Sequence, residues 1–297
     1  MKPPNPRVPR SPIFPRSLLV GIEEADFVRR WFATQPTEPR EMLDVGAHRG
    51  SSTKPFAVAG WRVHAFEPDP ANRAVFERQL QGFDNVTVDE RAVGDVDGDE
   101  VTLYESEESS GISSLVPFVD SHTPATTVET VRLDTFTDDA GVARVDFLKI
   151  DTEGFDLMVL RGFPWGRFSP AAVLCEYEDN KTSNIGYTTK DMLDFLVAKG
   201  YTVVVSEWHP IERYGVTHAF KQLSVYDGSV PYSTSWGNLI AVPDPHLAAR
   251  FVRDAYQILR PRHDPGDART ARLAFNAWWQ YRRITRALWR RRPEFLR

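Results

Sequence analysis

In the first half of the chain, segments whose apolar residues recur at helical spacing alternate with short apolar runs typical of strands. Phe27, Val28, Trp31 and Phe32 recur at helical spacing and predict a helix over residues 23–32. After it, short apolar runs alternate with segments of helical period that end near glycine or proline. The predicted strands are 41–45, 61–66 and 85–88, and the helices between them are 51–59 and 70–81. This order predicts parallel strands joined by right-handed crossovers.

The second half of the chain resumes the alternation after a polar interruption. We interpret the polar segment 106–123 as a loop or lid over a site, flanked by strands over 100–104 and 126–133. Further predicted strands are 145–150, 171–176, 201–206, 221–226 and 238–242, with helices over 155–160 and 189–199. The last two strands are expected to form an antiparallel closing pair. The expected fold class is α/β: a Rossmann-like, mostly parallel twisted sheet with helices on both faces and an antiparallel closing strand.

Composition divides the chain into three regions. Residues 1–22 are rich in proline and predict a flexible arm, and they lack the apolar core of a signal peptide. Residues 23–245 form the predicted domain, and residues 246–297 a basic helical extension. The single cysteine, Cys175, excludes an internal disulfide framework and favours a reducing, cytoplasmic location.

The charge of the chain is unevenly distributed. The whole chain carries −5, but residues 271–297 hold eight Arg and one Glu, so they carry +7 and the rest carries −12. An acidic body argues against nucleic acid as a partner.

The basic tail has the pattern of an amphipathic helix, with two interpretations. One apolar stripe joins Leu273, Ala277, Tyr281, Ile284 and Leu288, and Arg272, Arg283, Arg286 and Arg290 lie off it. Such a helix over 271–297 can lie on an anionic membrane surface as a peripheral contact. The favoured alternative is that the stripe docks on the acidic body or on a second copy of the chain, as a homo-oligomer, because amphipathic terminal helices most often complete a core.

The strongest local motif lies between the first predicted strand and the helix after it. It runs from Asp44 to Gly50 and reads Asp-Val-Gly-Ala-His-Arg-Gly. Glycine at such a turn lets the backbone approach a ligand, and the following helix presents free N–H groups. Glu67 stands at the end of the second strand, 23 residues after Asp44. A carboxylate at that position can accept both hydroxyls of a ribose.

Two classes of nucleotide-binding protein use this plan, and the glycine spacing separates them. A dinucleotide site needs glycines at the first, third and sixth positions, but counting from Gly46 the last two are histidine and serine. S-adenosylmethionine (SAM) has no pyrophosphate, so its site needs a tight turn, an acid near the methionine amino group and an acid on the ribose. Asp44, Gly46, Gly50 and Glu67 meet these needs. Glu67 weakens the alternative that residues 44–50 are only a strand-to-helix turn.

Further short motifs follow in a consistent order over about residues 42–176. They are Phe66-Glu67-Pro68, Asn85 to Val88, Ala92 to Asp95, Gly111 to Leu115, Leu133-Asp134, Leu148 to Gly154 and Val159 to Gly162. This combination resembles the FkbM family of SAM-dependent methyltransferases. The resemblance implies a class I methyltransferase fold with SAM as cofactor. The implied SAM contacts are Asp44, Gly46, Ala47, His48, Gly50, Glu67, Pro68, Ala92 and Asp151.

Two positions depart from the family pattern. His48 stands where the family often has asparagine beside the cofactor. Asp156 stands where a glutamate is usual after the Glu-Gly pair, so no role is carried over to that position.

The chemistry of methyl transfer points to a cluster of carboxylates. An alcohol is a poor nucleophile at neutral pH, so a base or a metal is expected to assist it. Asp151 ends a buried strand, Glu153 follows in the turn, and Glu176 ends the next strand. The carboxyl ends of parallel strands meet at one edge, where these three groups would bind a divalent cation. Equally, one of them would hold the SAM amino group and another act as base.

Other interpretations of these residues stay open. Asp151 and Glu153 are also placed to cap the helix that begins near Phe155. His209 is a further candidate for the catalytic base, as is His218, both on loops after core strands. Ser113 and Ser114 reach the site if the lid closes, although turn chemistry explains them as well.

The sequence therefore predicts a SAM-dependent enzyme that methylates a hydroxyl of a small molecule. The resemblance suggests a sugar or glycan, or a secondary metabolite, as the acceptor. The alternatives are a small-molecule N-methyltransferase and a non-catalytic protein of the same fold that binds a partner. A nucleotide-dependent sugar-modifying enzyme uses the same sheet, but the glycine spacing speaks against it.

Overall fold

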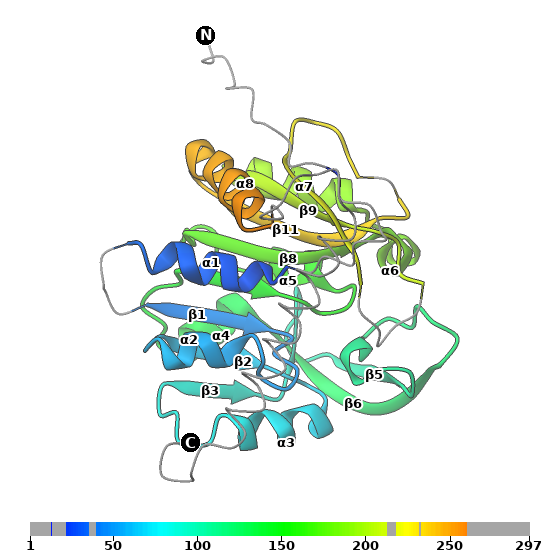
Figure 1. The fold of residues 1–297 in the computed structure, drawn as a ribbon. Coiled ribbons are helices and arrows are strands. Elements are labelled where there is room, and N and C mark those ends of the chain that lie inside the picture. The colour runs from blue at the N-terminus through cyan, green and yellow to red at the C-terminus, as the bar shows by residue number, and fades with distance from the viewer. Residues whose placement is uncertain (1–12, 14–21, 36–39, 213–217, 232, 260–297) are drawn as a thin grey trace, which may run out of the picture.

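The computed structural model describes residue 13 and residues 22–35, 40–212, 218–231 and 233–259. Its centre is an eight-stranded sheet in the order β10-β9-β11-β8-β7-β1-β2-β3 (Figure 1). The strands are β1 Glu41–Val45, β2 Arg62–Phe66, β3 Val86–Asp89, β7 Phe147–Ile150, β8 Ala172–Glu178, β9 Thr202–Trp208, β10 Phe220–Val225 and β11 Trp236–Val242.

The predicted parallel arrangement of the first half is confirmed. β3, β2, β1, β7 and β8 pair in parallel, with β1 at the point where the strand order reverses. β11 is antiparallel to both of its neighbours, β8 and β9. The predicted closing pair is wrong in one respect, because β10 and β11 do not pair with each other. β9 lies between them and pairs with both in antiparallel orientation.

Helices cover both faces of the sheet, as the sequence predicts. One face carries α1 Glu24–Phe32, α2 Thr53–Val58, α3 Pro70–Gln79 and α8 Pro245–Leu259, and the other carries α4 Leu133–Asp139, α5 Asp156–Gly162 and α7 Thr189–Ala198 (Figure 1). Val28 and Phe32, one turn apart on α1, pack with Met42 and Phe147 of the sheet. Burying each such side chain contributes about 1.5–3 kcal/mol to stability.

A small second sheet stands beside the main one. β4 Ala92–Gly94 pairs in parallel with β6 His122–Arg132, which also forms an antiparallel hairpin with β5 Glu100–Ser106. The two strands predicted around the polar segment are confirmed. The loop between them contains the short helix η2 Ser110–Ile112.

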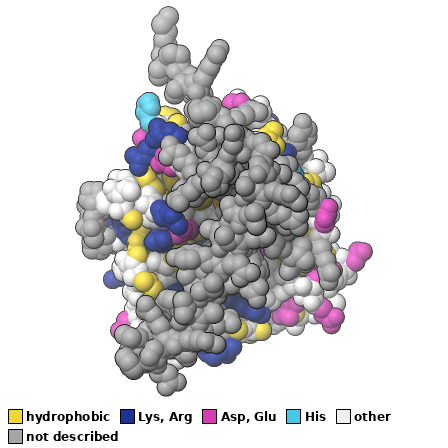
Figure 2. All heavy atoms as spheres, in the orientation of Figure 1, with side chains coloured by type: hydrophobic (Ala, Val, Ile, Leu, Met, Phe, Trp, Pro, Cys, Tyr) yellow, Lys and Arg dark blue, Asp and Glu magenta, His cyan; other side chains and the backbone are white. Residues whose placement is uncertain are grey.

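The end of the described chain packs against the sheet. Ala248, Phe251, Val252 and Ala255 of α8 are buried in the core shared with α1. The predicted amphipathic helix over 271–297 and most of the predicted arm over 1–22 lie outside the described residues. Within the described part, no helix is both long and apolar enough to cross a bilayer. On the face shown in Figure 2, basic, acidic and hydrophobic side chains are interspersed.

Candidate active site

A cleft of about 500 Å³ opens at the carboxyl ends of the central strands. Its floor includes Val45 of β1, Phe66 of β2 and Asp151 after β7, and η2 and α1 form walls. This volume falls within the range of about 300–1,000 Å³ that is typical of small-molecule sites. The position is the one where open parallel sheets bind ligands, next to the strand at which the order reverses.

The turn after β1 can be made only with glycine at its first position. Gly46 has a φ of 75°, and a Cβ added there would lie 1.8 Å from the carbonyl oxygen of Asp151. The backbone N–H groups of Gly46 and Ala47 donate to the carbonyl of Phe66, which fixes the turn to β2. His48 also has a positive φ, 50°. Gly46, Ala47 and His48 line the cleft, as predicted for cofactor contacts.

Two residues of the same motif support the turn from below and do not line the cleft. The buried Asp44 carboxylate accepts hydrogen bonds from the hydroxyls of Ser52 and Thr53. Lys149 lies 3.1 Å from Asp44 Oδ1 and donates to the carbonyl of Gly46. Gly50 packs against side chains of α3. The structure therefore places Asp44 in a buried ion pair rather than on the surface that would face a methionine amino group.

Glu67 lies in the cleft with both carboxylate oxygens held by the backbone. Oε2 accepts from the N–H of His48 at 2.6 Å, and Oε1 accepts from the N–H of Asp69 at 3.0 Å. A carboxylate oxygen has two acceptor positions, so each still has one free for a ligand. Burial raises the pKa of Glu67 to about 7. Pro68 and Ala92, two further predicted contacts, line the same cleft.

The loop between β5 and β6 joins the two sides of the cleft, which fits its interpretation as a lid. Ser113 donates to Asp69 beside Glu67, and Ser114 donates to the carbonyl of Glu153 on the other side. The ring of His48 lies 3.2 Å from the hydroxyl of Ser110. The predicted approach of Ser113 and Ser114 to the site is thus confirmed.

Asp151 and Glu153 line the cleft beyond the glycine turn. Glu153 has a φ of 55°, a backbone conformation that residues other than glycine rarely adopt. The alternative that these residues cap the next helix is wrong, because α5 has Phe155 at its N-cap and no capping side chain. Asp156 is buried and holds the backbone instead, since it accepts from Thr152 and from the N–H of Glu176. A strained backbone conformation like that of Glu153 is found most often at functional sites.

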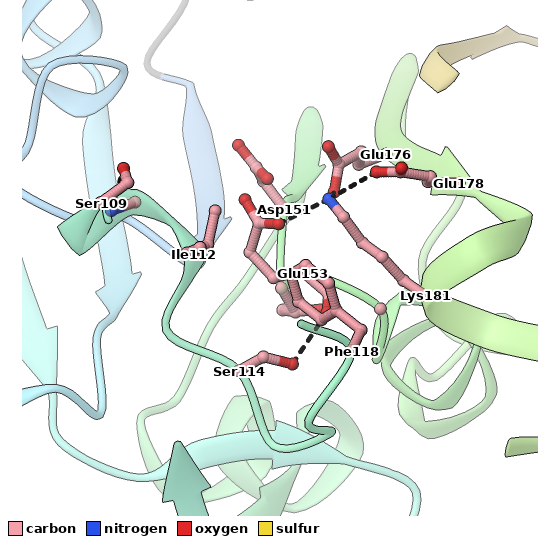
Figure 3. Close-up of polar contacts among 12 residues, drawn as sticks. Ser109, Ile112, Ser114, Phe118, Asp151, Glu153, Glu176, Glu178 and Lys181 are labelled. Carbon is pink, nitrogen blue, oxygen red and sulfur yellow. Dashed lines mark hydrogen bonds and ion pairs between the residues drawn. The ribbon is translucent and has the colours of Figure 1, made fainter. Parts of the chain in front are cut away.

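The three predicted carboxylates do converge. Asp151, Glu153 and Glu176 each offer an oxygen within 4.8 Å of the others. β8 does not end at Glu176 as predicted but continues to Glu178, and the single turn α6 Asp179–Thr182 follows at once. The turn returns Lys181 to the cluster, where its ammonium is held among glutamates (Figure 3). No pattern in the sequence indicates that this lysine joins the carboxylates.

Burial sets the protonation of this cluster. It raises the pKa of Glu153 to about 7 despite the nearby ammonium of Lys181. It raises the pKa of Glu176 well above its ordinary value. Burial alone would lower the pKa of Lys181, but Glu153, Glu176 and Glu178 together raise it. Lys181 therefore remains charged, and Glu153 can gain and lose a proton near neutral pH.

The two histidines considered as bases do not line the cleft. The N–H of His209 donates to the carbonyl of Ala219, and its own carbonyl accepts from the indole of Trp236. The ring of His218 packs edge-on against the same indole.

The cleft also contains residues that the sequence did not suggest. Glu24, at the start of α1, is buried and accepts hydrogen bonds from Ser206 and from the indole of Trp208. It lines the cleft together with Asn238 of β11. These contacts span about 180 residues of sequence, and no local pattern indicates them.

Comparison with known proteins identifies this arrangement. Residues 44–203, more than half of the chain, match the methyltransferase FkbM domain. The chain belongs to the FkbM methyltransferase family. It is therefore a SAM-dependent methyltransferase, and its Rossmann-like class I fold and the resemblance seen in its motifs are confirmed. No protein of curated function matches the chain.

Solved structures similar to this FkbM methyltransferase are distant. The precorrin-6y C5,15-methyltransferase of Geobacter metallireducens GS-15 is 15% identical, with a TM-score of 0.40 over 76% of this chain and 91% of that one. The SAM-bound magnesium protoporphyrin IX methyltransferase of Synechocystis PCC 6803 is 12% identical, with a TM-score of 0.37 over 74% and 78%. Similarity this distant says nothing about the acceptor.

The cleft of this methyltransferase suits SAM by its own geometry. Each oxygen of Glu67 keeps one acceptor position for a ribose hydroxyl. Gly46 leaves room that a Cβ would remove. Six carboxylates and one lysine are among the described residues of the lining, which suits a sulfonium cation.

Proposed function

We propose that this enzyme transfers the methyl group of SAM to a hydroxyl of an uncharged sugar, glycan or secondary metabolite. The observation that carries the proposal is Glu153, a cleft carboxylate whose pKa burial raises to about 7. A base is most effective when its pKa lies near the working pH. An alcohol needs such help, because it is a poor nucleophile while it keeps its proton.

Each group in the cleft then has a distinct task. SAM, when bound, supplies an activated methyl group on a sulfonium. Glu67 holds the ribose hydroxyls, and the backbone of Gly46 and Ala47 bounds the methionine part. Asp151, whose side chain is 44% exposed, faces the cleft and binds the methionine amino group. Ala92 and Phe155 give an apolar wall for the adenine.

The catalytic step needs alignment and proton removal. Rigid positioning of nucleophile and donor supplies much of the acceleration of an in-line displacement. Glu153 removes the proton of the acceptor hydroxyl as the oxygen attacks. The lid loop contacts this region, where Ser114 donates to the carbonyl of Glu153, and a lid of this kind keeps water from the reacting atoms.

The charge of the lining limits the class of acceptor. Six carboxylates against one lysine disfavour a phosphorylated or carboxylated acceptor, because like charges repel across a narrow cleft. Neutral polyhydroxylated molecules are not repelled, and their hydroxyl groups can donate hydrogen bonds to the carboxylates of the lining. An amine would also tolerate this lining, so the atom that is methylated has to be determined directly.

The test is a product analysis with SAM labelled with ¹³C in its methyl group. The enzyme is incubated with matched glucosides that carry a free hydroxyl, an amine or a phosphate at the same carbon. Methyl transfer to oxygen of the neutral acceptor is expected, with little or none to the phosphate. A product methylated only on nitrogen would overturn the proposal in favour of an N-methyltransferase.

A further inference from the structure

The ammonium of Lys181 lies among three glutamates at the side of the cleft. Its Nζ lies 2.5 Å from Glu153 Oε2, 2.8 Å from Glu176 Oε2 and 3.2 Å from Glu178 Oε2 (Figure 3). Nζ donates hydrogen bonds to Glu153 and Glu176, and Glu178 adds a third carboxylate within ion-pair distance. Two of these glutamates, Glu153 and Glu176, converge with Asp151 in the group that otherwise suggests a divalent cation.

The surroundings keep this ammonium away from water. The side chain of Lys181 is 2% exposed, although it belongs to the single turn that follows the carboxyl end of β8. The ring of Phe118, on the lid loop, lies 5.2 Å from Nζ and covers it. A buried lysine this well paired carries a fixed positive charge, and its removal leaves several carboxylates without a counter-charge.

The ammonium also fixes the orientation of the base. One oxygen of Glu153 is bound by Lys181, and within the described residues no hydrogen bond engages the other. The strained backbone at Glu153 and the donation from Ser114 to its carbonyl hold the turn from the other side. Lys181 is anchored to Glu176 of β8 at the same time, so Glu153 is fixed relative to the sheet.

We propose that Lys181 is a built-in cation, whose ammonium takes the place of a divalent metal ion and positions Glu153 toward the acceptor. This inference rests on the proposed role of Glu153 as base. In the reaction the acceptor O–H bond breaks and its proton passes to Glu153. The new O–C bond forms as the C–S bond breaks, and the electron pair of that bond stays on sulfur. Lys181 keeps its three protons throughout and is a positioning residue.

The first test uses the wild-type enzyme and needs no variant. Its turnover is expected to be the same in a chelator as in Mg²⁺ or Mn²⁺. Titration with Mn²⁺, followed by electron paramagnetic resonance, is expected to show no tightly bound ion at the cluster. Stoichiometric binding of Mn²⁺ together with loss of turnover in the chelator would overturn the proposal.

The second test removes the ammonium in two ways. Lys181→Ala leaves converging carboxylates and a space, so it is expected to bind Mn²⁺ and to gain thermal stability from it. Lys181→Met fills the space without charge and is expected to gain neither. Both variants should lower turnover by about 100-fold or more, the scale on which a positioned base acts. Wild-type turnover in Lys181→Met would contradict the positioning role.

The two proposals fail in different ways. If Glu153→Gln keeps full turnover, the proposed base is wrong, whatever Lys181 does. If Glu153→Gln is inactive but Lys181→Met is not, the base stands and the positioning role of Lys181 fails. If Lys181→Ala does not fold, the wild-type titration and chelator measurements still decide whether a metal ion is used.

Discussion

Lys149 and Asp44 lie opposite each other on the neighbouring strands β7 and β1, and Lys149 Nζ is 3.1 Å from Asp44 Oδ1. Both side chains are buried, and Lys149 also donates to the carbonyl of Gly46. The pair thus joins two central strands directly beneath the turn that borders the cleft. The turn after β1 is therefore stabilised by a buried ion pair as well as by packing.

Removing one member of this pair should destabilise the fold. Lys149→Met leaves Asp44 as a buried charge without its partner, which typically costs about 3–5 kcal/mol. The free energy of unfolding, measured in urea, should fall by that amount. Lys190→Met is the control, because Lys190 pairs with Asp194 on an exposed helix surface. Equal small effects of the two substitutions would show that the buried pair does not support the turn.

Gly46→Ala should abolish tight SAM binding. The added Cβ would meet the carbonyl oxygen of Asp151 at 1.8 Å, so the turn or the strand end must move. Gly60→Ala is the control that introduces backbone strain without a clash. Gly60 has a φ of 80°, but no atom lies within 4 Å of the new Cβ. The control should lose only about 1–2 kcal/mol of stability. Calorimetry should find SAM affinity normal in Gly60→Ala and at least about tenfold weaker in Gly46→Ala.

Glu67→Ala should weaken SAM binding without unfolding the protein. A charged hydrogen-bonded group contributes about 1.5–3 kcal/mol, which is about 10–150-fold in affinity. Calorimetric titration with SAM measures this change, and Glu77→Ala, on the exposed side of α3, serves as control. Unchanged affinity in a folded Glu67→Ala variant would mean that the ribose binds elsewhere.

The pH dependence of turnover should report the protonation of Glu153. Its pKa is raised to about 7, so below that pH it holds a proton and cannot accept another. Turnover at saturating SAM should therefore rise with pH through about 7 and then level off. Saturation removes the effect of Glu67, whose pKa is also about 7 but which acts on cofactor binding. A turnover that stays constant from pH 5.5 to 8.5 would contradict a carboxylate base in this range.

The local motifs could be predicted because their signals are short in sequence. Gly46 and Glu67 lie at strand ends, where a turn and a parallel crossover fix the geometry within a few residues. Both residues line the cleft. Asp44 belongs to the same motif, but whether it faces a ligand or a buried lysine depends on Lys149, about one hundred residues later.

Other features depend on contacts that no local pattern reveals. Lys181 joins the cluster only because β8 continues two residues past Glu176 and a single helical turn follows. Glu24 reaches the cleft because β9 supplies Ser206 and Trp208 to hold it. Similarly, the position of β9 between β10 and β11 follows from pairing over the whole sheet rather than from the spacing of the last two strands.

The most direct test of the account is the turnover of Glu153→Gln compared with its affinity for SAM. Glutamine keeps the size of the side chain but cannot take a proton from a hydroxyl, so only the chemical step should suffer. The affinity for SAM should stay within about twofold of wild type, a change of less than 1 kcal/mol. Turnover should fall by about 100-fold or more, as expected for the loss of a general base. Near-normal turnover of a folded, SAM-binding Glu153→Gln variant would contradict this account.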